Sequence, residues 1–415
     1  MTMKKIHNIG ILYFFPRHGG GTFQFTENVM CVLSDYAETQ RAVRAHLFFS
    51  KTQAEELVEI KSRFPNFIFH RISKITWMYY VLLRRIFFIV PLAVSILRYF
   101  YPLNWIARKH NIDLMVFPGI TADASFYWGR QITLFTDIAH IFYPHFPEVS
   151  EGDKLRQRNV LFKYGIKNAS QIVVESNQLR LDIAKFYQAN ISKVDVLYQT
   201  MSQAVCVNDN DEECVDFINT LPEKYLFYPA QLWEHKNHKN LLWALKLLVA
   251  KDYELCLILS GSRKKGDEQI FSLIDELNLQ DHVKYLGYVS DKFMPILYKN
   301  AQMLVMPTYF GPSNIPTLEA FYFGCPAVIS DLPGVREQSG NAALLFNPDS
   351  SEDIADKIQF VLYDKDRQEK MVKMGYERMK LLSYENYRDS LFSIIDKNLK
   401  DSLCKSSSVS IDATL

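Results

Sequence analysis

The chain contains few of the residues that mark exported or metal-binding proteins. Its 415 residues include only six cysteines, which are scattered and form neither a Cys-x-x-Cys pair nor a Cys/His pattern typical of a metal site. Isolated cysteines of this kind predict reduced thiols and a cytoplasmic protein. The first residues hold two lysines and a short apolar run, but no small-residue cleavage site follows. We therefore expect no signal peptide.

Acidic residues are absent between Glu59 and Asp113, although this stretch is rich in Lys and Arg. Its charge-free run Ile86–Leu97 has 12 residues, against the ~20 that a membrane-spanning helix needs. One interpretation is a core helix with a basic outer edge. We favour the other, in which residues 61–110 contact an anionic membrane surface from the cytoplasmic side. No nucleic-acid recognition motif accompanies the charge, so we expect no nucleic acid partner.

The composition is otherwise that of an ordinary globular protein, with 48% hydrophobic and 22% charged residues. The length predicts two to three domains. The net charge of +1 hides an asymmetry, because residues 1–200 hold 24 Lys and Arg against 15 Asp and Glu, while the rest hold 23 against 31. The two halves therefore present different surfaces to their partners.

Short apolar runs alternate with segments long enough for helices throughout the chain. This pattern predicts an α/β fold of two Rossmann-like, doubly wound lobes with a deep cleft between them. We expect domains at 1–203 and 204–383, a helix at 384–400 that crosses back to the first domain, and a disordered tail at 401–415. The predicted strands are Ile9–Phe15, His46–Phe49, Leu114–Phe117, Ile132–Phe135, Ile172–Val174, Val194–Tyr198, Tyr225–Tyr228, Leu255–Leu259, Val283–Leu286, Met303–Met306, Ala327–Ile329 and Ala343–Phe346.

The stretch Met303–Val328 reads as a strand, a turn-rich loop, a helix and the start of a second strand. Pro316 suits the first turn of a helix over Pro316–Phe323, because its φ is already helical. The loop before it, which contains Gly311 and Asn314, therefore faces unpaired backbone N–H groups and the positive end of the helix dipole. Such a helix start is a seat for phosphate or for sugar hydroxyls.

Glu319 lies about one turn inside that predicted helix. A capping box needs its carboxylate at the third helical position, and none of the candidate N-caps puts Glu319 there. Two interpretations remain, a carboxylate that complements the helix dipole and one that faces a ligand. We predict the second.

This stretch resembles the nucleotide-sugar site of retaining GT-B glycosyltransferases of the family 4 type, the glycosyl transferases group 1. That family's signature has two glutamates separated by seven residues. Glu319 matches the second, which in the family binds the donor's ribose, whereas the first is replaced by Gly311. In the second lobe, Lys236 matches the lysine with which the family neutralises the diphosphate, and Gln231 stands where the family commonly has an arginine.

The first lobe has two further loops of interest. Pro16–Thr22 is glycine-rich and follows the first strand, so it is either an ordinary tight turn or a loop whose amides approach the donor phosphates. Thr136–Ser150 leaves the carboxyl end of a strand, and there Asp137 and His140 are candidates for the group that faces the transferred sugar. The alternative for a histidine among aromatic residues is a structural role.

The resemblance implies the following site residues. The catalytic candidates are His140, Asp137 and Lys236. The donor-binding candidates are Gly20, Gly21, Gln231, Lys236, Gly287, Tyr288, Val289, Gly311, Ser313, Asn314, Ile315 and Glu319.

Two Asp-x-Asp pairs, at 209–211 and 364–366, are the kind of motif with which another glycosyltransferase class holds a divalent metal. Neither follows a strong apolar strand, so we interpret both as a solvated linker or a helix edge. We expect no metal ion and no cofactor.

The sequence thus predicts a glycosyltransferase that moves a hexose from a nucleotide diphosphate sugar to a glycan or lipid-linked acceptor in cell-envelope polysaccharide synthesis. Two rivals remain. One is a non-catalytic, membrane-associated partner of an active transferase, and the other is a nucleotide-sugar isomerase or phosphorylase on the same fold.

Overall fold

The protein forms two compact units in a computed structural model, which describes residues 6–13, 21–40, 42–50, 57–202, 212–251, 253–311 and 314–408. Unit 1 comprises Met1–His140, Gly152–Leu197 and Glu385–Leu415, and unit 2 comprises Ile141–Glu151 and Tyr198–Tyr384. The chain thus passes between the units at 197/198 rather than at the predicted 203/204. Sequence analysis also placed Ile141–Glu151 in the first domain, but its aromatic side chains pack on unit 2.

Unit 1 is built on a parallel sheet of seven strands in the order β3-β2-β1-β4-β5-β6-β7. All six strands predicted for this half are present, five of them with slightly different ends, and residues 14 and 15 of the first lie outside the described part of the chain. The strand β3 was missed because His70 and Arg71 interrupt its apolar residues. Chain order reverses between β1 and β4. The strands are β1 (His7–Leu12), β2 (Val43–Ser50), β3 (Phe67–Ile72), β4 (Leu114–Phe117), β5 (Gln131–Phe135), β6 (Gln171–Val174) and β7 (Val194–Val196).

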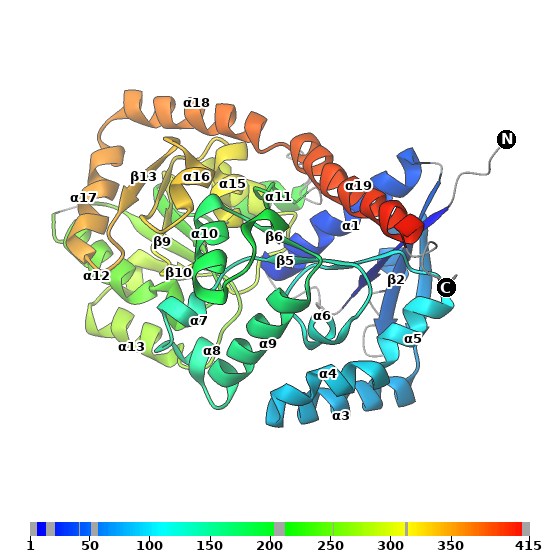
Figure 1. The fold of residues 1–415 in the computed structure, drawn as a ribbon. Helices are drawn as coiled ribbons and strands as arrows, with labels where there is room; N and C mark the ends of the chain where they lie inside the picture. Colours follow the sequence, from blue (N-terminus) through cyan, green and yellow to red (C-terminus); the bar gives the residue numbers. More distant parts are fainter. Residues whose placement is uncertain are drawn as a thin grey trace, which may run out of the picture. The chain divides into compact units, whose positions relative to one another are not determined.

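Helices connect and cover these strands (Figure 1). They are α1 (Gly21–Thr39), α2 (Leu57–Arg63), α3 (Lys74–Ile89), α4 (Val94–Leu97), α5 (Pro102–Lys109), α6 (Ala122–Phe126), α7 (Ala139–Phe142), α9 (Lys154–Asn168), α10 (Asn177–Tyr187) and α19 (Tyr384–Ser408).

The last helix, α19, packs on unit 1. Tyr36 of α1 donates a hydrogen bond to Asp396, and the Tyr36 ring contacts Phe392 edge-on at 4.8 Å between centroids. The helix continues to Ser408, whereas the sequence predicted a disordered tail from residue 401. That segment has no proline or glycine to stop a helix, and its polar composition alone did not end it. Residues 409–415 lie outside the described part of the chain.

Unit 2 repeats the architecture with a parallel sheet of six strands in the order β10-β9-β8-β11-β12-β13. All six predicted strands are present. Chain order reverses between β8 and β11, so the loops that leave these two neighbouring strands open at the same edge of the sheet. The strands are β8 (Tyr225–Pro229), β9 (Cys256–Ser260), β10 (Val283–Tyr285), β11 (Met303–Met306), β12 (Ala327–Ser330) and β13 (Ala343–Phe346).

The helices of unit 2 enclose a core of buried aliphatic and aromatic residues. Helix α12 packs against α13 and α17, and α15 packs against α18. Asp364 caps α18 by accepting the backbone N–H of Arg367, which agrees with the helix-edge interpretation of this Asp-x-Asp pair; the pair at 209–211 lies outside the described residues. The helices are α8 (Pro147–Ser150), α11 (Glu212–Asn219), α12 (His238–Val249), α13 (Glu268–Glu276), α14 (Met294–Asn300), α15 (Ile315–Tyr322), α16 (Val335–Ser339), α17 (Ser351–Leu362) and α18 (Lys365–Leu381).

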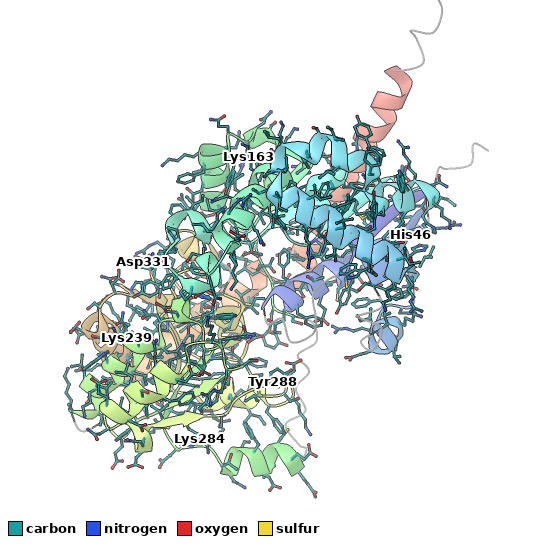
Figure 2. All side chains as sticks on the ribbon, turned by 90° about the horizontal axis from the view of Figure 1, so that it is seen from below. His46, Lys163, Lys239, Lys284, Tyr288 and Asp331 are labelled. Carbon is teal, nitrogen blue, oxygen red and sulfur yellow. The ribbon has the colours of Figure 1, made fainter. Side chains whose placement is uncertain are left out.

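The acid-free stretch forms the helices α3, α4 and α5, and Figure 2 views unit 1 from the side on which they lie. One face of α3 enters the core through Tyr80, Leu83 and Phe87. The opposite face leaves apolar side chains exposed, at 63% for Met78 and 70% for Ile89. The core interpretation is therefore confirmed for one face of α3, whereas contact of the other face with a membrane stays a prediction. Within the described residues, no helix is long and apolar enough to cross a membrane.

Arg84 of α3 points into the protein, although sequence analysis counted it with the basic surface. Its Nη2 lies 2.6 Å from Oδ2 of Asp123, whose side chain is fully buried. The hydroxyl of Tyr101 donates a second hydrogen bond to the same carboxylate. Asp123 lies in α6. It therefore joins α6 to α3 through Arg84 and to the start of α5 through Tyr101.

Replacing Asp123 with Ala should therefore destabilise unit 1. The change leaves the Arg84 guanidinium and the Tyr101 hydroxyl without their buried partner, and breaking such a pair from one side costs about 3–5 kcal/mol. We expect a loss of that size in the free energy of unfolding measured by urea denaturation. Asp153→Ala, at an exposed helix start, is the control. Equal stability of the two variants would contradict the assigned role.

Candidate active site

The loops that follow β8 and β11 meet at the point of unit 2 where strand order reverses. The carbonyl of His235 accepts hydrogen bonds from Tyr309 N at 2.9 Å and from Thr308 Oγ1 at 3.3 Å. The ring of His235 stacks on Phe310 with centroids 4.0 Å apart. In doubly wound folds, ligands bind beyond the carboxyl ends of the strands at this kind of reversal. The contacts therefore assemble a candidate site from two of the predicted loops.

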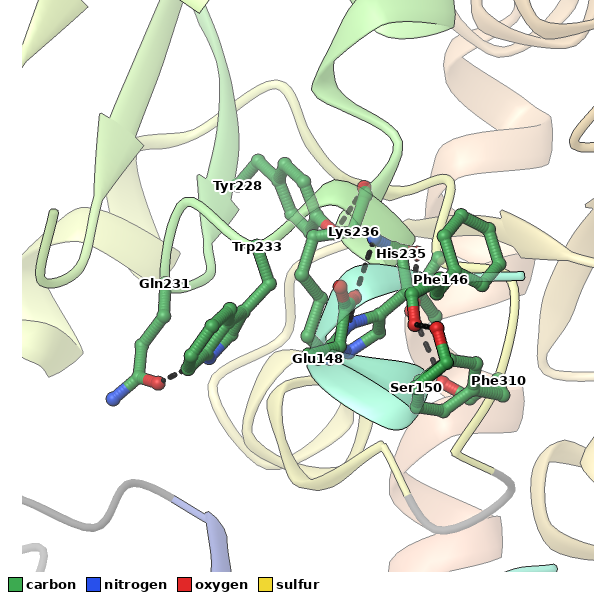
Figure 3. Close-up of polar contacts among 10 residues, drawn as sticks. Phe146, Glu148, Ser150, Tyr228, Gln231, Trp233, His235, Lys236 and Phe310 are labelled. Atoms are coloured by element: carbon green, nitrogen blue, oxygen red, sulfur yellow. Dashed lines mark hydrogen bonds and ion pairs between the residues drawn. The ribbon is translucent and has the colours of Figure 1, made fainter. Parts of the chain in front are cut away.

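Lys236 ends a short 3-10 turn, Glu234–Lys236, just before α12. Its backbone is held on both sides, because its N–H donates to Trp233 O at 3.1 Å and its carbonyl accepts the Tyr228 hydroxyl at 2.8 Å (Figure 3). Its side chain is half-buried. The loop thus presents a cation next to the N-terminus of a 12-residue helix, where an anion is favoured.

Asn237 makes this turn possible. It adopts a left-handed conformation with φ +57°, which asparagine tolerates better than most residues. Its buried amide donates to Pro307 O at 3.0 Å and to Pro348 O at 2.7 Å. One side chain therefore joins the loops that follow β8, β11 and β13. Asn237 was not among the predicted site residues, because the short segment around it offers no sign of its distant partners.

His238 begins α12 directly behind Lys236 and is 2% exposed. Burial, with Lys236 and His235 as nearby cations, lowers the pKa of its imidazole to about 3. Within the described part of the chain, neither ring nitrogen has a hydrogen-bond partner. His238 is therefore neutral at pH 7 and does not add to the positive charge of the loop.

Gln231 occupies the position of the family's arginine and supplies no charge. Its Oε1 accepts the Trp233 indole N–H at 2.9 Å, and Figure 3 shows the two side chains lying together. The ammonium group of Lys264 lies 5.1 Å from the centroid of the Trp233 ring. Lys236 and Lys264 thus supply positive charge at this edge of the sheet, and Gln231 does not.

Helix α15 begins at Ile315, one residue earlier than predicted, with Asn314 as its N-cap and Pro316 in its first turn. Gly311, in the loop before it, has φ +105°. A glutamate here would be strained, because L-residues with a side chain rarely adopt this conformation. The loop is thus shaped for glycine at the position of the family's first glutamate. Ser313 lies outside the described residues.

Glu319 lies one turn inside α15 and is 5% exposed. Its Oε2 accepts the hydroxyl of Tyr298, from α14, at 2.6 Å. Burial, followed by the neighbouring Glu319 carboxylate, raises the pKa of Tyr298 well above its usual value, so Tyr298 remains a donor at all ordinary pH values. The tyrosine thereby fixes the direction of the carboxylate.

Replacing Tyr298 with Phe should alter the donor site without removing any group from it. We expect the KM for the donor to rise about tenfold, because loss of a hydrogen bond to a charged group costs about 1.5–3 kcal/mol. Turnover at saturating donor should change less. Tyr225→Phe, which removes a buried hydroxyl bonded to the carbonyl of Leu297, is the matched control. An unchanged donor KM would contradict a role for Tyr298 in orienting Glu319.

The turn predicted to meet the nucleobase follows β10 at the same edge of the sheet. Gly287 has φ +66°, and its carbonyl accepts Gly261 N at 2.7 Å, which ties this turn to the loop after β9. Tyr288, labelled in Figure 2, is exposed, and Val289 is half-buried. The turn therefore lies two strands away from β8, with the loop after β9 between them.

The remaining predicted residues lie in unit 1. Gly20 lies outside the described residues, and Gly21 is the first residue of α1. Asp137 is half-buried and caps α7 by accepting Ala139 N at 2.8 Å. His140 is 2% exposed, its Nε2 bonds the Tyr187 hydroxyl at 2.7 Å, and burial lowers its pKa to about 4.

This environment is that of a neutral, structural histidine, with the ring of Phe162 4.2 Å from that of His140. Asp137 is the more accessible of the two predicted residues. Across the described ranges, no group of three or more His, Cys, Asp and Glu residues is arranged to hold a metal ion.

Comparison with known proteins finds a described family for part of the chain. Residues 211–378, which contain the Lys236 and Glu319 loops, match the family model described as glycosyl transferases group 1. The chain is 27% identical over 265 residues to the O-antigen chain mannosyltransferase B of Escherichia coli, covering 62% of this chain and 68% of that protein. It is 26% identical over 192 residues to the O-antigen chain mannosyltransferase RfbU of Salmonella typhimurium, covering 46% of this chain and about half, 51%, of that protein.

Among solved structures, the fold is similar to that of sucrose-phosphate synthase from Thermosynechococcus elongatus. The two superpose with a TM-score of 0.72 over 94% of this chain and 98% of that one, at 17% identity. The fold and the matched segment together indicate a glycosyltransferase with two Rossmann-like units. Residues 211–378 are thus similar to the glycosyl transferases group 1, and the architecture of the chain is the GT-B fold.

Proposed function

We propose that this glycosyltransferase moves a hexose from a nucleotide diphosphate sugar to a glycan or lipid-linked acceptor in the synthesis of a cell-envelope polysaccharide, with retention of configuration. Mannose is the sugar to test first, because both relatives described above are named O-antigen mannosyltransferases. The observation that carries the proposal is the pairing of Lys236 with the start of α12 at the strand reversal of unit 2.

In this reaction the main task of the loop is to supply positive electrostatic potential. As the bond between the sugar and the diphosphate breaks, negative charge grows on the departing diphosphate, and preorganised cations and N–H groups stabilise it there. Lys236 and the N-terminus of α12 supply both. Glu319, directed by Tyr298, binds the ribose, and Asp137 faces the transferred sugar. With lysines supplying the positive charge, we propose that transfer requires no metal ion.

The outer face of α3, α4 and α5 would bring the enzyme to a lipid-linked acceptor. The exposed apolar residues Ile75, Met78, Leu82 and Ile89 follow each other at intervals of three, four and seven along α3 and so share one face. Exposed basic residues, Lys74, Arg85, Arg108 and Lys109, accompany them. We name this surface the α3–α5 face. Apolar side chains beside cations suit the boundary of an anionic membrane, so we propose a cytoplasmic, membrane-peripheral protein.

Incubating the purified protein with radiolabelled UDP and GDP sugars and a membrane lipid extract tests the proposal. We expect one sugar nucleotide to label a lipid-extractable product, and we expect that labelling to persist in EDTA. GDP-mannose should be included first. Conversion of the sugar nucleotide or of a sugar phosphate without any acceptor would contradict transfer and support an isomerase or phosphorylase.

A further inference from the structure

The segment Ile141–Glu151, which we call the strap, lies between elements of unit 1 in the sequence but packs on unit 2. Its ring contacts are with the loop that follows β11. Phe146 lies 5.3 Å from Tyr309, and Tyr143 lies 5.8 Å from Phe310, between ring centroids. The strap thus rests on the same loop that receives His235.

Glu148, in the first turn of α8, joins the strap to the loop after β8. Its Oε1 accepts the backbone N–H of His235 at 2.8 Å and also the Nδ1 of the same residue (Figure 3). Because the carboxylate can only accept, Nδ1 carries the proton. The Glu148 side chain is 9% exposed. Burial raises its pKa, but the hydrogen bonds from His235 outweigh burial, and the pKa is lowered overall.

His235 is thereby held on every side. Glu148 accepts hydrogen bonds from its backbone N–H and from its ring Nδ1, and Phe310 stacks on the ring. Its carbonyl accepts hydrogen bonds from the loop after β11. The next residue is Lys236. Because a peptide has only two soft dihedrals per residue, fixing both polar groups of His235 limits where Lys236 can begin.

We propose that Glu148 is a positioning residue for donor binding, acting through His235 to hold Lys236 where it meets the diphosphate. The inference rests on the proposed function, since it assumes that Lys236 binds the donor. In this proposal the strap helps to order the donor-binding loop of unit 2, although it lies between elements of unit 1 in the sequence. Glu148 itself need not touch the substrate.

The full-length variants E148A and E148Q test the proposal, with E151A as the matched control. Glu151 lies on the same strap, and its ion pair with Lys265 is exposed, so its loss should have little effect. Calorimetric titration with UDP and GDP gives the nucleotide Kd. We expect E148A to raise it about 10-fold to 100-fold, as the loss of hydrogen bonds to a charged group would. E148Q retains an acceptor oxygen and should recover part of the affinity.

Hydrogen exchange of residues 231–240 provides a second measurement that does not depend on ligand. We expect faster exchange there in E148A than in the wild type or in E151A. A purely structural role would lower the folded fraction and the apparent turnover while leaving the Kd of the folded molecules unchanged, and that result would overturn the proposal. If E148A does not fold, E148Q carries the test.

The proposed function and the positioning role of Glu148 can be contradicted by different results. A wild-type protein that binds no nucleotide at all would defeat the proposed function. The exchange data would still decide whether Glu148 orders the loop, and unchanged exchange in both variants would defeat the positioning role whatever the nucleotide result.

Discussion

Replacing Lys236 with Ala should lower turnover of the enzyme by about 10²–10³, the usual effect of removing one preorganised group that stabilises charge in the transition state. The reason is electrostatic. Lys236 is the half-buried cation beside the N-terminus of α12, and Gln231 provides no second positive charge. Steady-state rates with the accepted sugar nucleotide measure the effect, together with the Kd for the nucleoside diphosphate.

The loss of affinity should come from weaker contacts to the phosphates rather than from weaker contacts to the base. The Lys236→Ala variant should bind UDP or GDP more weakly but should bind the free nucleoside as the wild type does. Lys236→Arg retains the charge and should recover part of the activity. Lys239→Ala, an exposed lysine one turn away, is the control. Wild-type rates in Lys236→Ala would place the diphosphate elsewhere.

Introducing three glutamates on the α3–α5 face, at Met78, Leu82 and Ile89, should release the protein from anionic vesicles. Each of these side chains is at least half exposed. If each contributes about 1 kcal/mol when it enters the membrane boundary, the triple variant should partition about 100-fold more weakly. Charge repulsion from the lipid adds to that loss. Co-sedimentation with phosphatidylglycerol-containing vesicles measures the partition.

A matched variant shows whether the effect belongs to this face. Val58, Val215 and Leu381 are also exposed apolar residues, and glutamates there make the same chemical change elsewhere. That control should bind vesicles as the wild type does. The triple variant should keep its activity toward a water-soluble acceptor while losing activity toward lipid-linked acceptors in vesicles. Equal vesicle binding by the two triple variants would rule out the α3–α5 face as the membrane contact.

Much of the fold could be predicted because buried parallel strands are continuous apolar runs. Leu114–Phe117 and Met303–Met306 were predicted with their exact bounds. Phe67–Ile72 was missed because His70 and Arg71 interrupt its apolar residues, which the structure accommodates because β3 is an edge strand. Local chemistry also predicted the helix start near Pro316, since a proline and a capping residue act within one turn.

The partners of the site residues could not be predicted, because they come from distant parts of the chain. Glu148 and His235 are 87 positions apart, and Tyr298 and Glu319 are 21 apart on different helices. No local rule relates such pairs. For the same reason, the sequence left open whether His140 faces a substrate or the core, and its burial beside Phe162 and Tyr187 depends on packing.

The sequence by itself determined the two doubly wound sheets, the match of Lys236 to the family's lysine, and the acid-free stretch that forms the α3–α5 face. These are local properties, set by the period of apolar residues and by charges near one another in the chain. Only the tertiary structure decided that Arg84 turns inward to Asp123, that the strap leaves unit 1 for unit 2, and that Glu148 holds the residue before Lys236. Each of these depends on buried polar groups, which must find partners wherever the folded chain brings them.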